Sequence, residues 1–559
     1  MSKVWLLVCI LLFTAASAAF MLQGCSCNPR EGKQNGERLA RIKQNQHPDP
    51  FGKYVPPITL TAMRFFDEKN KAYPPGDSLE NNVWTRAYEE KLGIKIKYLW
   101  TAATWQEFDE KVNAAIAADE LPDLMPLYTT LFFRVAHAGK AADLTEVYDK
   151  HATPAVKENL SIAGEIALKS ATFDGKLYGL AIPPDIYGGA ELLWIRRDWL
   201  RNLKLSPPRH MNDVIRIAQA FAGQDPDGNG KRDTVGLAMH KDLYWGTASI
   251  IGFANGYHAY PYTWVEKDGK LVFGSVQPEM KTVLGNLAAL YKFGAIDREF
   301  AIKNPNIELV RDFESGKIGM VYGGDWLPNW PLNLNCAKDP KADWAPFKIV
   351  SVDENPALAQ IDTRVSNFLA VNFKCKHPEA LIKIFNLHYE LAASNNPADR
   401  IYHDQDGIDT FMLGLFYAYR PYYNIECHLK VSEALINSDV SKLNPEQRGY
   451  YEKARDYLDG ADPKGWSAWR IFGPKGSQAL LKEINDQNLC YYNRGCGPET
   501  QAWIEYGPLL RNKEIEYFTR IIMGAAPLTE FEKWVEYFEK HGGGKATREI
   551  NKQWREQRK

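Results

Sequence analysis

Residues 58–66 read ITLTAMRFF, a run of apolar and β-branched side chains typical of a strand, and they open the pattern that decides the fold. A helix is predicted over 80–92, and residues 94–100 (IKIKYLW) alternate as a half-buried strand does. A second helix is predicted after Thr104, and residues 121–127 (LPDLMPL) return to strand. This alternation favours an α/β fold with a parallel sheet covered by helices on both faces. Ligands of such sheets bind at the carboxyl ends of the strands.

The elements around this stretch extend the pattern. Residues 104–107 (TWQE) predict a capping box, in which Thr104 caps the helix and Glu107 reaches back to it. Strands and helices alternate again from Leu192, and residues 365–373 (VSNFLAVNF) look like a return to the first sheet. The last strong helix is predicted after Thr529, as its N-cap, and is expected to end at the glycines 542–544.

Composition limits the class of protein. The 559 residues include 68 basic and 69 acidic side chains, a net charge of -1, which argues against a nucleic-acid partner. Hydrophobic residues make up 45% and charged residues 25%, as in globular proteins, and the length predicts two to four domains. The 16 Trp, 28 Tyr and 25 Phe are more rings than a core needs, so some are expected to line a surface cleft.

The N-terminus predicts export. One lysine precedes an apolar run over 4–21, so residues 1–24 are interpreted as a secretory signal peptide. Its end, LQGC, resembles a bacterial lipobox, which predicts cleavage before Cys25 and lipidation of that residue. The alternative is an uncleaved transmembrane anchor, for which the run is short. Residues 25–55 are polar and rich in turn formers, as in a flexible tether, so the expected location is extracytoplasmic, lipid-anchored to a bacterial membrane.

Residues 225–233 (DPDGNGKRD) have the spacing of a calcium-binding loop. Oxygen-bearing side chains alternate at Asp225, Asp227, Asn229 and Asp233, with a glycine at the bend. The Lys231 carbonyl is available as a further ligand, but the glutamate that usually completes the shell is replaced by a glycine. The loop therefore predicts structural Ca²⁺, with a solvated turn as the alternative.

The cysteines and the known catalytic motifs give weaker signals. Cys490 and Cys496 are close enough in sequence to suggest a disulfide, whose pairing stays open. No GxSxG, HExxH, Walker A or GxGxxG motif occurs, which removes several enzyme classes. A glycosidase needs only two suitably placed carboxylates, so a secreted polysaccharide-active enzyme stays an alternative.

Five segments together resemble a known family. They are the lipobox, residues 174–208 (DGKLYGLAIPPDIYGGAELLWIRRDWLRNLKLSPP), 225–238 (DPDGNGKRDTVGLA), 264–300 (WVEKDGKLVFGSVQPEMKTVLGNLAALYKFGAIDREF) and 531–554 (FEKWVEYFEKHGGGKATREINKQW). In this order they are similar to the extracellular solute-binding protein family 1, and within it to the alginate-oligosaccharide binding proteins. The loop of those relatives binds calcium with help from an adjacent residue, a place that Thr234 takes here.

The resemblance implies a two-lobed, periplasmic-binding-protein-like (type 2) fold, each lobe a mainly parallel sheet flanked by helices. Lobe 1 would comprise residues 56–185 and about 363–415, and lobe 2 residues 190–362 and about 416–559. The crossings between the lobes are expected near 181–191, near 362–368 and after about Leu415. The implied function is capture of an oligosaccharide by a monomeric receptor and delivery to the membrane subunits of an ABC importer. A receptor for peptide or another polar solute is the other alternative.

A saccharide cleft needs flat rings for the CH faces of sugars and polar groups for their hydroxyls. Candidates lie at strand ends or crossings, although a ring at such a place more often packs in the core. Trp100 and Trp105 are further candidates in lobe 1. The predicted substrate-binding residues are Tyr128, Tyr187, Tyr244, Trp245, Tyr262, Trp264, Asp325, Trp326, Trp466, Trp469 and Arg470.

Overall fold

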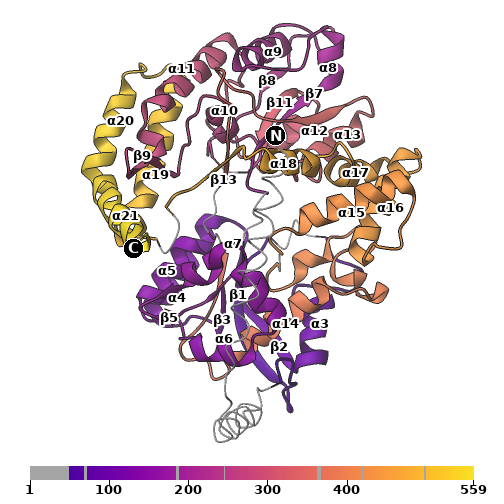
Figure 1. Cartoon of the computed structure of the whole chain (residues 1–559), viewed down its shortest axis with the longest axis vertical. Helices are drawn as coiled ribbons and strands as arrows, with labels where there is room; N and C mark the ends of the chain where they lie inside the picture. Colours follow the sequence, from indigo (N-terminus) through magenta and orange to yellow (C-terminus); the bar gives the residue numbers. More distant parts are fainter. Residues whose placement is uncertain are drawn as a thin grey trace, which may run out of the picture. The chain divides into compact units, whose positions relative to one another are not determined.

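The structure is a computed structural model that describes residues 49–67, 72–183, 188–244, 246–361, 365, 367–417, 420–495 and 499–558. From Pro50 onward the chain forms one compact unit, with helices and strands arranged as in Figure 1. The predicted signal peptide, Cys25 and most of the tether lie outside the described residues. Among the residues described, no helix combines the length and the apolar character that crossing a membrane requires.

The first sheet has five strands in the order β2-β1-β3-β14-β6. They are β1 (Ile58–Phe65), β2 (Ile94–Ala102), β3 (Leu124–Tyr128), β6 (Leu180–Ala181) and β14 (Asn367–Val371). The helical elements of this part of the chain are α3 (Val83–Ala87), η2 (Tyr88–Leu92), α4 (Trp105–Ala118), α5 (Thr129–His137), α6 (Thr145–His151), α7 (Pro154–Ala171) and α14 (Glu379–Ala392). The strands predicted at 58–66, 94–100 and 121–127 are thus confirmed.

The second sheet has four strands in the order β12-β7-β11-β8. They are β7 (Leu192–Arg196), β8 (Val235–Leu237), β11 (Ile318–Gly323) and β12 (Trp344–Phe347). The helices before its last strand are α8 (Arg197–Asn202), α9 (Met211–Gly223), α10 (Ile251–Asn255), α11 (Pro278–Phe293), α12 (Glu308–Glu314) and α13 (Leu332–Lys338). Two short pairs accompany this sheet, β9 (Trp264–Lys267) with β10 (Lys270–Phe273) and β13 (Ala359–Ile361) with β15 (Cys490–Tyr492).

Helices make up most of the chain after α14. They are α15 (Tyr423–Asn437), α16 (Pro445–Leu458), α17 (Trp466–Phe472), α18 (Ser477–Asp486), α19 (Gln501–Ile522), α20 (Glu530–Phe538) and α21 (Gly544–Gln557). Many of the residues that these helices bury belong to the core of the second sheet, including Trp503, Phe518 and Trp534.

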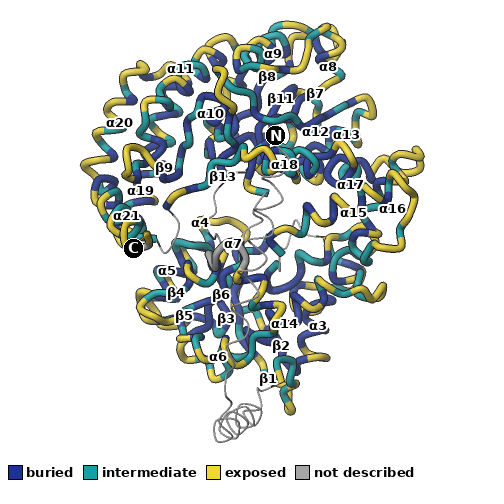
Figure 2. The backbone as a smooth tube through the Cα atoms, viewed as in Figure 1, coloured by how far each residue is buried: buried dark blue, intermediate teal, exposed yellow. Residues whose placement is uncertain are grey.

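Two separate hydrophobic cores define two lobes. Lobe 1 is built on the first sheet, and its core draws on residues 60–181 and 365–416. Lobe 2 is built on the second sheet, and its core draws on residues 190–361 and 425–550. Buried backbone follows the strands of both sheets in Figure 2. The chain therefore passes between the cores after β6, before β14 and after Phe416.

The prediction of mainly parallel sheets is wrong in detail. β14 runs antiparallel to both β3 and β6, and β7 runs antiparallel to both β11 and β12. Both strands are the first that the chain forms after it has passed between the cores. β14 begins with Asn367 opposite Tyr128, and β7 begins with Leu192 opposite Gly323, so each starts at the carboxyl edge of its sheet. A strand that enters at this edge must run against its neighbours.

Two local predictions also differ from the structure. The Thr104 hydroxyl accepts the Glu107 N–H at 3.2 Å, but the Glu107 carboxylate accepts the N–H of Ala103 rather than that of Thr104. Thr529 precedes α20 without a side-chain cap. The helix does stop at the glycines as predicted, because the backbone leaves helical dihedral angles at His541 and Gly542. Residues Glu539–Gly543 form a kinked turn from which α21 continues to Gln557.

A buried polar cluster fixes residues 410–416, the last part of lobe 1 before the chain leaves for α15. Trp84 and Arg64 donate hydrogen bonds to backbone carbonyls of this segment, and the Leu415 N–H donates to the Tyr88 hydroxyl at 3.1 Å. The same hydroxyl lies 2.5 Å from Nε2 of His388, whose ring stacks on Trp84. Burial holds the pKa of His388 well below its usual value, so this ring is neutral.

Candidate functional site

The carboxyl edge of the first sheet carries a group of aromatic side chains, the lobe 1 aromatic cluster of Phe65, Trp105 and Tyr128. Phe65 ends β1, Tyr128 ends β3, and Trp105 is the first residue of α4, which follows β2. The Trp105 ring stacks on Phe65 with centroids 3.8 Å apart and planes 4° apart. Tyr128 meets the same indole edge-on at 5.7 Å. Stacking on Phe65 fixes the orientation of the Trp105 indole, and 55% of the Trp105 surface still faces solvent.

A hydrogen bond to α4 holds Tyr128 in the lobe 1 aromatic cluster. The Tyr128 hydroxyl donates a hydrogen bond to the Asp109 carboxylate on α4. Burial and this carboxylate together raise the pKa of Tyr128, so the phenol stays protonated and remains a donor. Trp100, the other ring considered for lobe 1, is partly buried and packs edge-on against Phe108. The structure thus places Tyr128 and Trp105 together at the carboxyl edge, and their predicted role in binding stays a prediction. Phe65 was missed because it reads as an ordinary strand residue.

The carboxyl edge of the second sheet carries Asp325 and Trp326, directly after β11. The Asp325 side chain is buried and accepts a hydrogen bond from Nε2 of Gln478 at 2.5 Å, while its carbonyl accepts one from Oγ of Ser477 at 2.9 Å. These contacts tie the turn to the start of α18. Trp326 follows with 37% of its surface exposed. The turn thus presents a second indole at a fixed place.

Glu191 is a residue of this edge that sequence reasoning missed. It lies immediately before β7, at the end of the first passage between the lobes. Its carboxylate accepts the Gly252 N–H at 2.7 Å, at the start of α10. Burial raises the pKa of this carboxyl to about 7, against hydrogen bonds from Ser249 and Gly252 that lower it. An acidic residue directly before the apolar run at residues 192–195 was the available signal.

Besides Asp325, four of the predicted substrate-binding residues are buried in the structure. Trp264 packs against Phe273 and Trp503, and the Tyr244 hydroxyl donates to the Glu514 carboxylate at 2.5 Å. Little of their surface is left for a ligand, so they are placed as core residues. The four are Tyr244, Trp264, Trp466 and Arg470, each no more than 5% exposed.

The remaining rings are intermediate or lie outside the described residues. Trp469 is partly buried, with the Arg470 guanidinium 4.2 Å from its ring centroid. Tyr262 is partly buried too, and the Arg511 guanidinium lies 5.4 Å from its ring centroid. Tyr187 and Trp245 fall outside the residues that the structure describes. Their predicted roles stay predictions.

The loop predicted to bind calcium is held by its own oxygen atoms. Asp225 accepts the N–H groups of Asn229 and Gly230 at 3.0 and 2.8 Å. The Asn229 side-chain amide donates to Asp227 at 2.8 Å and to Asp233 at 3.3 Å. Partial burial and the neighbouring Asp225 raise the pKa of Asp227, because nearby carboxylates oppose its ionisation. A hard cation would relieve this crowding of negative charge, so the donor set fits Ca²⁺ in kind.

Other features of the loop are less favourable for a metal. The Thr234 hydroxyl, predicted as a ligand, donates to the Phe221 carbonyl at 2.5 Å and is buried. Within the described part of the chain, no group of three His, Cys, Asp or Glu side chains is arranged to hold a metal ion. A disulfide between Cys490 and Cys496 was suggested by their spacing. Cys490 is a free thiol in the structure, and Cys496 lies outside the described residues.

Comparison with curated proteins gives two informative relatives, both from Bacillus subtilis (strain 168). The polygalacturonan/rhamnogalacturonan-binding protein YtcQ is 31% identical over 254 residues, which cover 45% of this chain and 47% of YtcQ. The chain thus matches about half the length of that relative. Lipoprotein LipO is 22% identical over 487 residues, covering 84% of this chain and 88% of LipO.

Solved structures share the fold. The alginate-binding protein AlgQ2 superimposes with a TM-score of 0.61 at 16% identity, over 90% of this chain and 99% of its own. The Streptococcus pneumoniae substrate-binding protein FusA, in complex with kestose, gives a TM-score of 0.59 at 15% identity, over 90% of this chain and 99% of its own. Both are two-lobed solute-binding proteins, which confirms the predicted fold class.

The family itself is shown by a model described as bacterial extracellular solute-binding protein, which matches residues 71–387. That segment is more than half of the chain and includes the second sheet, every strand of the first sheet except β1, and Trp105, Tyr128 and the Asp325 turn. The named relatives are binding proteins rather than enzymes. The chain belongs to the bacterial extracellular solute-binding protein family.

Proposed function

We propose that this protein is an extracytoplasmic receptor that binds an oligosaccharide between its two lobes and delivers it to the membrane subunits of an ABC importer. The ligand would lie between the carboxyl edges of the two sheets. Closure of the lobes requires contacts that the ligand makes only when both edges grip it.

One observation carries the proposal: each carboxyl edge presents an exposed indole on a fixed support. Trp105 lies flat on Phe65 at the edge of lobe 1, and Trp326 follows the anchored Asp325 at the edge of lobe 2. Exposed indoles are costly in water unless a ligand covers them, and the CH faces of sugar rings do this well. At the same edge of lobe 2, the Glu191 carboxylate directly before β7 is an acceptor of the kind that sugar hydroxyls need.

The relatives support the same ligand class. YtcQ is named for binding polygalacturonan and rhamnogalacturonan, and FusA is named as a fructooligosaccharide ABC transporter substrate-binding protein. LipO is named a lipoprotein, which agrees with the lipobox that ends at Cys25. We therefore include lipidation of Cys25, attachment to the membrane by that anchor alone, and a monomeric receptor in the proposal.

Structural Ca²⁺ at the Asp225 loop is a further part of the proposal. Asp225, Asp227, Asn229 and Asp233 would supply side-chain oxygens and Lys231 its carbonyl. The cation would neutralise three carboxylates that otherwise repel one another, and so hold the turn between α9 and β8.

The test is titration of the purified protein with neutral and acidic oligosaccharides, followed by calorimetry. Trp105→Ala and Trp326→Ala should each weaken binding by about 1–3 kcal/mol, roughly five- to 150-fold, because each removes a stacking face. Phe293→Ala, which removes an exposed ring at the end of α11, is the matched control and should leave affinity unchanged. Unchanged affinity in both Trp variants contradicts the proposal. Release of new reducing ends from the ligand would instead favour an enzyme.

A further inference from the structure

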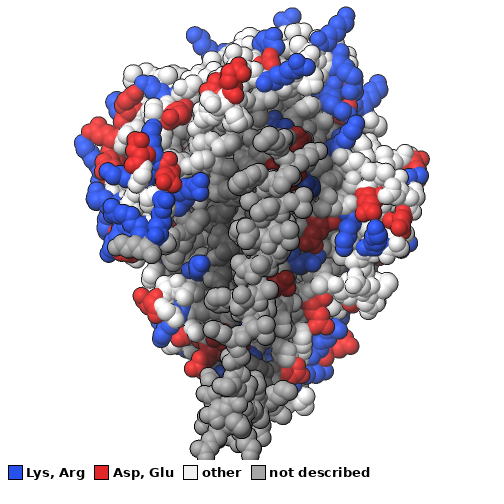
Figure 3. Space-filling model, viewed as in Figure 1, with Lys and Arg blue, Asp and Glu red and all other residues white. Residues whose placement is uncertain are grey.

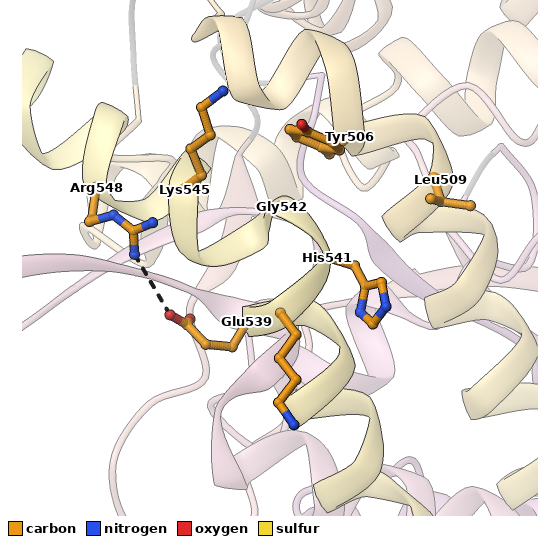
Figure 4. Close-up of a pocket in the computed structure, with 8 residues that line it drawn as sticks. Tyr506, Leu509, Glu539, His541, Gly542, Lys545 and Arg548 are labelled. Carbon is orange, nitrogen blue, oxygen red and sulfur yellow. Dashed lines mark ion pairs between the residues drawn. The ribbon is translucent and has the colours of Figure 1, made fainter.

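A pocket with a volume of about 330 Å³ lies at the kink between α20 and α21, where α19 passes it. Figure 4 shows its lining side chains, which come from α19, the kink and the first turn of α21. Its residues belong to neither of the two carboxyl edges. In the view of Figure 3, Lys and Arg side chains lie among Asp and Glu side chains over these C-terminal helices.

The kink brings an aromatic ring into the wall of the pocket. Gly542 has a φ of 109°, a conformation open to glycine and strained for other residues. A Cβ on Gly542 would lie 2.2 Å from Cγ of Tyr506, so the phenol ring packs directly against this backbone. Leu509, also on α19, adds an apolar side chain that is about half exposed. One side of the pocket is therefore a flat, apolar surface.

The rest of the lining is mainly cationic, and the Lys545 ammonium lies over the Tyr506 ring, 5.7 Å from its centroid. Lys540, Lys545 and Arg548 contribute three positive charges, and Glu539 is the carboxylate among the lining side chains. Lys540 is paired with Glu536, which lies outside the pocket. The Arg548 guanidinium reaches Glu539 at 3.9 Å and the Lys545 ammonium reaches Glu505 at 3.9 Å, both too long for hydrogen bonds. Arg548 and Lys545 therefore keep donors for a closer acceptor.

We propose that this pocket binds a uronate, a sugar ring that carries a carboxylate. Lys545 and Arg548 donate hydrogen bonds to the carboxylate, and Tyr506 with Leu509 packs against the CH face of the ring. Glu539 is an internal carboxylate that competes for Arg548. The inference rests on the proposed function in taking a sugar as the ligand, and it adds a second subsite, specific for acidic units, outside the interlobe site.

The experiment follows His541, which lies on the pocket rim and stacks on Tyr537 at 3.9 Å. Protein labelled with ¹³C at its 11 histidines is titrated with D-galacturonate, D-galactose and inorganic phosphate, and a His541→Gln variant assigns the signal. Galacturonate should shift the His541 resonance in a saturable way, whereas galactose should not. Phosphate, which lacks the ring, should bind more weakly than galacturonate.

Variants of the lining test the roles of the charges. The double variant Lys545→Gln with Arg548→Gln should weaken galacturonate binding roughly tenfold, since two charge-assisted contacts are lost. Lys552→Gln with Arg555→Gln, on the exposed surface of the same helix, is the matched control and should change nothing. Glu539→Gln should tighten binding roughly two- to fivefold, because the internal competitor is removed.

The outcomes separate this pocket from the interlobe site. Trp105→Ala should weaken oligosaccharide binding, measured by calorimetry, roughly five- to 150-fold and leave the His541 titration intact. No shift with galacturonate, an equal shift with galactose, phosphate binding as tight as galacturonate, or an unchanged titration in the Lys545/Arg548 variant each overturns the pocket proposal alone. Loss of both responses in Trp105→Ala overturns the independence of the two sites.

Discussion

Replacing Tyr88 by Phe tests how strongly lobe 1 holds residues 410–416. The change removes one hydroxyl that lies 2.5 Å from Nε2 of His388 and accepts the Leu415 N–H at 3.1 Å. Both partners are buried, and the smaller side chain gives neither of them a substitute. Each unsatisfied buried group costs roughly 1–3 kcal/mol, so for the two groups we expect the free energy of unfolding to fall by about 2–6 kcal/mol.

The assay combines urea unfolding with hydrogen exchange at Leu415. Its amide should exchange faster in Tyr88→Phe, because the N–H loses the Tyr88 hydroxyl as its acceptor and the segment opens locally. Tyr322→Phe is the matched control, since the buried Tyr322 hydroxyl has no hydrogen-bond partner among the described residues. Its loss should be neutral or slightly stabilising. A change below ~0.5 kcal/mol in Tyr88→Phe, with unchanged exchange at Leu415, refutes the reasoning.

Three further outcomes are expected. The pKa of His388 is well below its unfolded value of about 6.5, so below that pH the unfolded chain binds a proton that the folded protein does not. The free energy of unfolding should therefore fall by about 1.4 kcal/mol for each pH unit below that value. In His388→Gln, the urea midpoint should depend less on pH between pH 7 and pH 5. EDTA should lower the melting temperature and calcium should restore it, with both effects absent in Asp225→Asn; indifference to EDTA and calcium removes the metal from the proposal. Gly542→Ala should destabilise by at least ~1 kcal/mol, through its positive φ and its contact with Tyr506, while Gly460→Ala, with φ 73° but open space around it, should cost less.

Local pattern was sufficient for the first three strands of lobe 1 and for the sheet edge at which the candidate rings lie. The alternation over 58–127 gave three strands and their parallel order, and hence the edge where Tyr128 and Trp105 meet. The hydrophobic pattern could not predict the direction of a strand that follows a passage between the lobes. A run such as LLWIR is equally apolar in either direction, and only the edge at which β7 enters decides it.

Exposure of individual rings was the part that could not be predicted. Trp264 and Trp326 both stand near turns, yet Trp264 is enclosed by Phe273 and Trp503 while Trp326 remains exposed. The enclosing Trp503 comes from α19, more than two hundred residues further along the chain. Because such distant partners decide whether a ring is buried, the local sequence around an aromatic residue does not reveal its burial.

The position of β14 in the first sheet has a consequence for biogenesis. This strand fills the gap between β3 and β6, although the whole of the second sheet is synthesised before it. Until residue 371 has emerged on the far side of the translocon, β3 and β6 each expose an unpaired edge. Until β14 pairs with them, these edges must be shielded from aggregation in the newly exported chain. A chaperone that covers them would act before the polypeptide is complete.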